Sequence, residues 1–267
     1  MTEEQIWKRI TLGDEYGFGG MHYDYTVDLL GNPVYNDGLE GRILGMDDDD
    51  TLENQLLAHV PKEQIFNNLT LLLLEKQYAL SWRQMFRSRP RLRFNGCYIS
   101  TVNYTRPGAA STTQVTWHTP VHIVTYFRYL RFFRDGSVIS LLTTSEPGDV
   151  VHHLTKENLH RHHRTVLPSA VMKDALRGRW RLSGPGDGVA SEEAEGDVHV
   201  ETEGVVPKYM WRMQFALGSA GRGTRNNKLS WKGFWSYNKL TDDWGEFGLK
   251  NDRAYYWSRV KSYGMAW

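Results

Sequence analysis

Apolar residues in the first part of the chain recur every three or four positions, which indicates helices. Glu3 to Ile10 fits one short helix. A longer stretch, Leu52 to Tyr78, keeps the helical spacing but contains Pro61, so it predicts two helices rather than one. One further helical turn is predicted just before Pro90. We therefore expect residues 1–80 to form an irregular segment with a few short helices.

Beyond Pro90, apolar and polar residues alternate with a period of two, which is typical of strands with one buried face. The alternation covers Arg91 to Asn95 and resumes after Gly96. Asp135 and Gly136 separate two β-rich runs, which is the strongest short signal for a β-hairpin, and Gly136 is expected to have a positive φ. Strands are predicted over Val121 to Phe133, Val138 to Leu142, Val198 to Thr202, Lys208 to Leu217, Lys228 to Tyr237, Trp244 to Leu249 and Ala254 to Tyr263.

The predicted strands follow one another without intervening helices, which favours an antiparallel barrel or sandwich over residues 81–267. Two short motifs favour the barrel. A glycine, any residue and then an aromatic residue open two strands, in FNGCYIS with Tyr98 and in LRGRWRLS with Trp180. The first motif is similar to the opening of lipocalin-like, calycin-type barrels, where the aromatic side chain closes one end. We therefore predict a mainly β fold, an antiparallel lipocalin-like barrel.

The alternation also predicts which side chains face the inside of the barrel. Trp211 and Phe215 share one face of their strand, and Trp231 and Trp235 share one face of the next. With the aromatics of the two motifs, the predicted interior comprises Tyr98, Trp180, Trp211, Phe215, Trp231 and Trp235. If the tryptophans line an empty cavity, the barrel would hold a small apolar ligand.

Composition narrows the class of protein and of partner. The chain has 267 residues, a net charge of +1 and an isoelectric point near 7.9, so no global field attracts nucleic acid or an anionic membrane. Cys97 is the single cysteine, which excludes an intramolecular disulfide and fits a reducing compartment. The longest aliphatic run, Leu71 to Leu74, is too short to span a bilayer. We expect a protein of the cytoplasm, with the nucleus as the alternative location, and without nucleic-acid or membrane partners.

Several short motifs suggest chemistry but lack the residues that it needs. Histidines cluster in VHHLTKENLHRHHR, yet no cysteine or orienting carboxylate recurs with them at the spacing of a zinc site. The run MDDDD at Met46 to Asp50 lacks the spacing and turn glycine of a cation loop. The loop from Gly218 to Asn227 lacks the ending of a phosphate loop. We therefore expect no catalytic residues, no metal and no cofactor, and we interpret Cys97 as a buried apolar side chain.

Arginine and aromatic residues interleave before and within the first predicted strand. Arg83, Arg87, Arg89, Arg91 and Arg93 alternate with aromatic residues in this stretch. One interpretation is a single-stranded nucleic-acid platform. The other is that arginine stems pack over aromatic rings, which explains the pattern equally well without a nucleic-acid partner.

Three blocks carry a resemblance to a known family. They are SWRQMFRSRPRLRFNGCYIS, YFRYLRFFRDGSVISLLTT and the terminal YYWSRVKSY. In this order they resemble the C-terminal domain of the F-box only protein 9 family, which includes a fungal branch of F-box proteins. The resemblance covers Ser81 to about Tyr263, and the N-terminal IWKRITLGDEYGFGGMHYDY is similar to the link between the F-box and this domain.

This resemblance implies a function, which composition and spacing do not. It implies the substrate-recognition part of an SCF-type E3 ubiquitin ligase, a non-enzymatic domain that binds the protein to be ubiquitinated. Ile6 and Trp7 are then the end of the last F-box helix, a remnant of the surface that docks on the SCF adaptor. Because the F-box is largely missing, we expect the adaptor and the cullin to bind only when a complete F-box is present. The alternative is a lipocalin-like barrel that binds a small apolar ligand.

Overall fold

The computed structural model describes residues 2–13, 15–34, 61–107, 121–159, 169–185 and 196–264. The helices are α1 (Glu3–Leu12), α3 (Lys62–Lys76), α4 (Trp82–Ser88) and α5 (Pro147–Val150), with short 3-10 turns at Phe18–Gly20, Val151–His153, Lys156–Asn158, Ser169–Met172 and Lys261–Tyr263. The strands are β1 (Gly96–Pro107), β2 (Val121–Phe132), β3 (Ser137–Thr143), β4 (Leu176–Leu182), β5 (Asp197–Glu203), β6 (Tyr209–Gly218), β7 (Lys228–Asn238), β8 (Asp243–Glu246) and β9 (Tyr255–Arg259).

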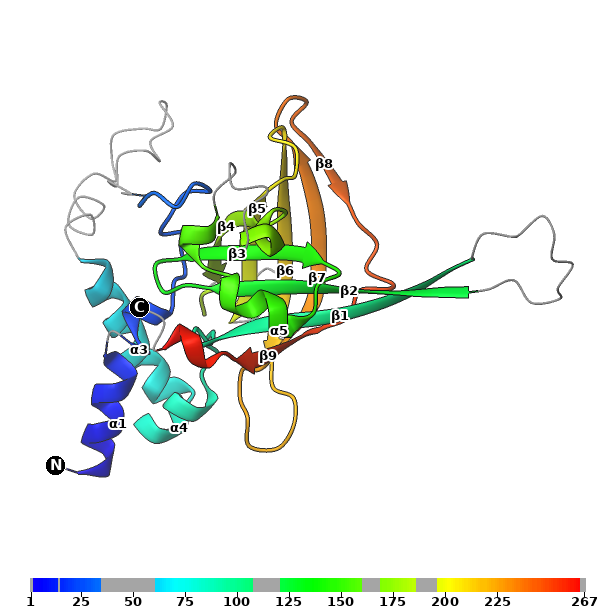
Figure 1. Cartoon of the computed structure of the whole chain (residues 1–267). Helices are drawn as coiled ribbons and strands as arrows, with labels where there is room; N and C mark the ends of the chain where they lie inside the picture. The colour runs from blue at the N-terminus through cyan, green and yellow to red at the C-terminus, as the bar shows by residue number, and fades with distance from the viewer. Residues whose placement is uncertain are drawn as a thin grey trace, which may run out of the picture.

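The strands form a closed antiparallel barrel, as the sequence predicts (Figure 1). The hydrogen-bonded order is β6-β5-β4-β3-β2-β1-β9-β7, and a further pairing of β6 with β7 closes this eight-stranded ring. β8 pairs with the free edge of β7 beyond the point where β9 ends. The mainly β fold is confirmed, and closure leaves few unpaired edges. The lipocalin-like assignment is compatible with this ring.

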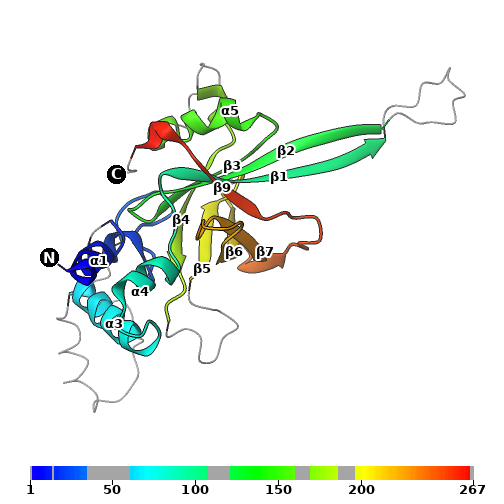
Figure 2. The ribbon, with the colours of Figure 1, turned by 90° about the horizontal axis from the view of Figure 1, so that it is seen from below.

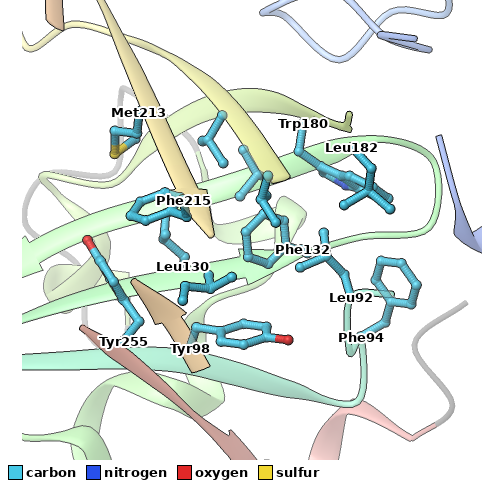
Figure 3. Close-up of a cluster of buried hydrophobic side chains, with 14 of the residues drawn as sticks. Leu92, Phe94, Tyr98, Leu130, Phe132, Trp180, Leu182, Met213, Phe215 and Tyr255 are labelled. Atoms are coloured by element: carbon cyan, nitrogen blue, oxygen red, sulfur yellow. The ribbon is translucent and has the colours of Figure 1, made fainter. Parts of the chain in front are cut away.

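The inside of the barrel is filled by aromatic and aliphatic side chains (Figure 3). Trp180, Tyr98, Phe132 and Phe215 are fully buried there. The Trp180 indole donates a hydrogen bond to the Phe133 carbonyl at 2.9 Å, so its one polar atom is satisfied. Burying one such phenylalanine side chain contributes about 1.5–3 kcal/mol, so this packing is the main source of stability.

A second apolar layer covers the outer face of β1, β2 and β3. Tyr129, Ile139 and Leu141 point outward from these strands and are buried by α5, which supplies Val150, and by Leu154, which follows the next 3-10 turn. Cys97 belongs to the same layer and is fully buried and unpaired. The two sides of this part of the sheet are therefore both apolar, which explains the nearly continuous hydrophobic runs of β2 and β3.

The helices of the N-terminal segment pack beside one end of the barrel, as both views show (Figures 1 and 2). α3 and α4 contribute Leu73, Leu74 and Met85 to a cluster of their own. Phe66 of α3, however, belongs to the barrel core, and the Arg89 guanidinium donates to the Thr70 hydroxyl at 2.9 Å. Packing thus crosses residue 80, and the boundary between residues 1–80 and 81–267 stays a prediction.

Several element predictions differ from the structure at their ends. Residues 91–95 are not a strand, because they form no regular ladder with a neighbouring strand, although Leu92 and Phe94 are buried as their alternation suggests. The predicted β8 and β9 are shortened to Asp243–Glu246 and Tyr255–Arg259. The predicted helix before Pro61 and the acidic run Met46 to Asp50 lie outside the described residues. Among the described helices, none is long and apolar enough to cross a membrane.

The Asp-Gly hairpin is confirmed. β2 and β3 pair from Phe127 with Thr143 to Phe132 with Val138, and Gly136 has φ +91° in the connecting turn. A Cβ at Gly136 would overlap the hydroxyl of Thr26. Both the backbone conformation and the space around the turn therefore select glycine.

We expect Gly136→Val to lower the free energy of unfolding by more than about 1 kcal/mol, because a β-branched residue disfavours positive φ and also clashes with Thr26. Urea denaturation measures the loss. Gly31→Val is the matched control, since Gly31 has φ +89° but nothing lies within 4 Å of its added Cβ. Equal losses in the two variants would show that the contact with Thr26 does not matter.

Candidate functional site

Five of the six predicted interior aromatics lie on the inner face of the barrel or at its end. Tyr98, Trp180 and Phe215 are fully buried in the core cluster. Trp231 is half-buried against it, with its ring 4.5 Å from that of Phe215. Trp211 follows the alternation of β6 and contacts the rings of Phe234 and Phe247 at 5.8 and 5.6 Å.

The prediction for Trp235 is wrong. A β-bulge in β7 shifts the register at Lys232, because Trp231 pairs with Phe215 while Gly233 pairs with the adjacent Gln214. One extra residue reverses which face the following side chains occupy. Phe234 takes the inner position, and Trp235 lies opposite Arg212 on the outer face.

Gly233 leaves room for the Trp235 ring on the outer face of the barrel. A Cβ at Gly233 would overlap the ring of Trp235, so the indole lies directly over the glycine. Glycine in a strand interior often marks such a close approach. The bulge and the glycine together place a large aromatic side chain flat on the outside of the barrel wall.

The filled interior argues against the small-ligand alternative. That alternative requires a cavity lined by Trp211, Phe215, Trp231 and Trp235. Instead, Trp231 and Phe215 are in ring contact with each other and with Tyr255, and Trp235 points away from the inside. Side chains thus occupy the space that a bound apolar ligand needs.

A hollow on the outside of the barrel wall, here called the outer groove, offers a binding surface instead. It measures about 460 Å³ and is lined by Tyr25, Arg181, His199, Arg212, Gln214, Trp235 and Trp244. The register explains how these residues meet. Arg181 pairs with His199, His199 with Gln214, and Arg212 with Trp235 across adjacent strands. The outward-facing side chains that are neighbours across β4, β5, β6 and β7 therefore form one continuous surface.

A buried carboxylate holds Arg212 of the outer groove and the neighbouring Arg179 in place. Glu201 of β5 is 1% exposed and accepts hydrogen bonds from Arg179 at 2.7 and 2.9 Å and from Arg212 at 2.7 and 3.0 Å. Burial alone would raise the pKa of Glu201, but the hydrogen bonds from the two guanidinium groups outweigh it and hold the pKa below its ordinary value. Each guanidinium donates two hydrogen bonds to one carboxylate oxygen, Arg179 to Oε2 and Arg212 to Oε1, and the two charge-assisted pairs fix both arginines.

The fixed arginines in turn orient aromatic rings. The Arg212 guanidinium lies 4.5 Å from the ring centre of Trp244, and that of Arg179 lies 4.2 Å from the ring centre of Tyr25. Burial raises the pKa of Tyr25 to about 12, so its hydroxyl is neutral at physiological pH. The outer groove thus presents aromatic rings beside a guanidinium group that Glu201 holds in place.

The residue types of the outer groove are those of protein-binding surfaces. Tryptophan, tyrosine and arginine are the residues that dominate binding energy at protein interfaces. In the described part of the chain, no three His, Cys, Asp or Glu side chains come together to hold a metal ion. His160, His162 and His163 of the predicted histidine cluster lie outside that part. Burial raises the pKa of Cys97 to about 12, so its thiol is not a nucleophile.

Comparison with known proteins identifies the family. The profile of the F-box only protein C-terminal region matches residues 72–242, which include β1 to β7 and most of the outer groove. The chain belongs to this family.

Two curated fungal proteins are similar to this F-box only C-terminal domain. The F-box protein pof7 of Schizosaccharomyces pombe is 31% identical over 194 residues, 71% of this chain and 47% of that protein. The F-box protein HRT3 of Saccharomyces cerevisiae is 31% identical over 186 residues, 68% of this chain and 47% of that protein. The chain thus spans about half the length of the curated relatives it matches. No solved structure matches it.

The predicted adaptor-docking residues lie on α1. Ile6 is 46% exposed, whereas Trp7 packs against the helical cluster and its ring lies 5.2 Å from that of Phe86. The Trp7 indole also donates a hydrogen bond to Glu3 at 3.3 Å. Trp7 therefore helps to join α1 to α4, and a role of Ile6 and Trp7 in this F-box only protein as an adaptor-docking surface stays a prediction.

Sequence reasoning missed most of the outer groove. The alternation along β6 places Arg212 and Gln214 on the face opposite Trp211 and Phe215, but it indicates no role for them. Arg181, His199 and Glu201 come from other strands, and no local motif connects them to Arg212. The only signal in the sequence is that a glutamate and two arginines occupy outward positions of predicted strands. Whether these residues meet depends on the strand register, which the sequence does not give.

We expect Glu201→Gln to lower the free energy of unfolding by about 1.5–3 kcal/mol at neutral pH, because a neutral amide replaces a carboxylate that accepts four charged hydrogen bonds. The folded-state pKa of Glu201 is lowered, so the difference from the wild type is full above the ordinary value of 4.5 and disappears as the pH falls through the lowered pKa. Urea denaturation across this pH range measures it.

The exposed Glu246 of β8 supplies the control. Glu246→Gln removes the same charge from the same sheet without breaking a buried ion pair, and we expect a change within about 0.5 kcal/mol. If the two variants lose equal stability, or if the loss in Glu201→Gln persists unchanged at acidic pH, the ion-pair account of this wall is wrong.

Proposed function

We propose that this domain recognises a protein substrate for an SCF-type E3 ubiquitin ligase and does so without enzymatic activity of its own. Membership of the F-box only protein family supports the ligase context, and the names of the fungal relatives agree with it. In such a ligase the adaptor and the cullin engage a complete F-box, while this domain engages the target. The cytoplasm or nucleus, where a free buried cysteine such as Cys97 stays reduced, is the proposed location.

The observation that carries the proposal is the outer groove on a packed barrel. Because the interior is filled, binding capacity lies on the outside, and the outer groove concentrates Trp235, Trp244 and Arg212 there. Trp244 is 42% exposed although it is large and apolar. Aromatic groups fixed before binding lose little side-chain entropy when a partner docks, which raises affinity. The outer groove is therefore the proposed contact surface for the substrate.

We expect Trp235→Ala/Trp244→Ala to abolish substrate capture while leaving the barrel folded. Truncating hot-spot residues costs about 2 kcal/mol or more each, so retention of a specific partner falls by more than about tenfold. Quantitative affinity capture from cells that express wild-type or variant protein measures the change. A captured protein counts as a substrate when its half-life lengthens after loss of this protein and the double variant fails to restore turnover.

Tyr256→Ala is the matched control, since Tyr256 of β9 is 52% exposed and is not among the residues lining the outer groove. It is expected to capture the same partner at the wild-type level. Equal capture by the wild type and the double variant would exclude the outer groove as the contact surface. Capture of partners whose half-lives never depend on this protein would contradict the ligase role itself.

A further inference from the structure

A second hollow lies between α4 and the loop that joins β6 to β7, and arginines dominate it. Its larger part measures about 610 Å³. The arginines lining it are Arg87, Arg91, Arg93, Arg222 and Arg225. A smaller hollow of about 250 Å³ adjoins it and shares Arg91, Arg93 and Arg225. We call the two together the arginine groove. It is distinct from the outer groove, with which it shares no lining residue.

Among the residues that the structure describes, the arginine groove carries positive charge without matching negative charge. Within this described part of the chain, no carboxylate lines its larger part, and none of its five arginines forms an ion pair with an acidic residue. The smaller part contains Glu15, but that carboxylate is 3.6 Å from Arg134 and already paired. Five like charges around one hollow repel one another, and an anion placed between them relieves this repulsion.

Packing holds two of these arginines in fixed positions. The Arg91 guanidinium lies 3.8 Å from the ring centre of Phe86 and 5.2 Å from that of Tyr16. Arg93 donates a hydrogen bond from Nε to the Arg225 carbonyl at 2.9 Å and lies 4.6 Å from the ring centre of Trp257. Burial, aided by the charge of Arg93, lowers the pKa of Arg91 to about 10, which still leaves it cationic at neutral pH.

The opposite wall of the arginine groove is a braced loop. The Asn227 side chain accepts a hydrogen bond from the Ala220 amide at 2.6 Å and donates one to the Ala220 carbonyl at 2.9 Å. The Ser219 hydroxyl accepts from the Asn226 amide at 3.0 Å. These bonds tie the two ends of the loop together, so Arg222 and Arg225 project from a defined turn. Both arginines are exposed and available to a ligand.

We propose that the arginine groove binds an acidic segment of a partner protein, an extended peptide with several Asp or Glu side chains. Planar guanidinium groups pair bidentately with carboxylates, which suits this class of ligand. A single-stranded nucleic acid needs open aromatic faces on which bases stack. Here Arg91 covers Phe86 and Arg93 covers Trp257, and the net charge of the chain is only +1. The proposal goes beyond the ligase role and does not depend on the outer groove.

The test uses a fluorescent Glu-rich peptide of about twelve residues, long enough to cross the arginine groove in an extended conformation. Its Gln-for-Glu analogue has the same length without charge. Fluorescence anisotropy with the full 267-residue chain measures affinity. We expect binding of the Glu peptide alone, and weakening as the salt concentration rises, because the contacts are partly exposed.

Arg222→Glu/Arg225→Glu reverses two exposed charges of the loop and is expected to weaken binding of the Glu peptide by about tenfold or more. Lys239→Glu/Lys250→Glu is the matched control, because it changes the net charge equally at exposed positions that do not line the arginine groove. It is expected to bind within about twofold of the wild type. Arg87→Glu/Arg225→Glu is a second variant, and either decides the test once its melting temperature shows that it is folded.

Three results would overturn the proposal. The first is no binding of the Glu peptide at low salt. The second is equal weakening by the Lys239/Lys250 control, which would assign the effect to net charge. The third is tighter binding of a single-stranded oligonucleotide that competes with the peptide and is lost in the arginine variants, which would identify the arginine groove as a nucleic-acid surface. None of these outcomes bears on substrate capture by the outer groove.

Discussion

The pairing of β6 with β7 closes the sheet, and both surfaces of the barrel depend on it. Closure brings Phe215 of β6 against Trp231 of β7 and lets the inner side chains form one contiguous cluster. An open sheet of these strands would expose that cluster to water, at a cost of about 25 cal/mol for each Å² of apolar surface. The same pairing contains the bulge that turns Trp235 outward, so one contact region both seals the core and builds the outer groove.

Glu201 both stabilises the outer wall of the barrel and positions an arginine of the outer groove. A buried carboxylate is unfavourable unless it is paired and hydrogen-bonded, and here two arginines satisfy it from neighbouring strands. Because Arg212 is hydrogen-bonded to Glu201, its guanidinium group keeps its position when Trp244 moves or a ligand binds. The outer groove is therefore rigid for the same reason that this wall is stable.

The N-terminal helices give the barrel a second surface of different character. α4 packs with α1 and brings Phe86 beneath Arg91, while the β6–β7 loop brings Arg225 from the other side. The arginine groove thus requires both the helical segment and the closed barrel. The stacking of arginine over aromatic rings, one of the two interpretations of the sequence pattern, is what the structure contains.

The sequence by itself determined the class of the fold and the local elements. Its two periods separated the N-terminal helices from the strands, the Asp-Gly pair placed the β2–β3 hairpin, and the resemblance identified the family. These features depend on residues close together in the chain. The tertiary structure decided what depends on register, namely closure through β6 and β7, the outward turn of Trp235, and the meeting of Glu201 with Arg179 and Arg212. A bulge of one residue reverses inside and outside, and neither alternation nor composition records its position.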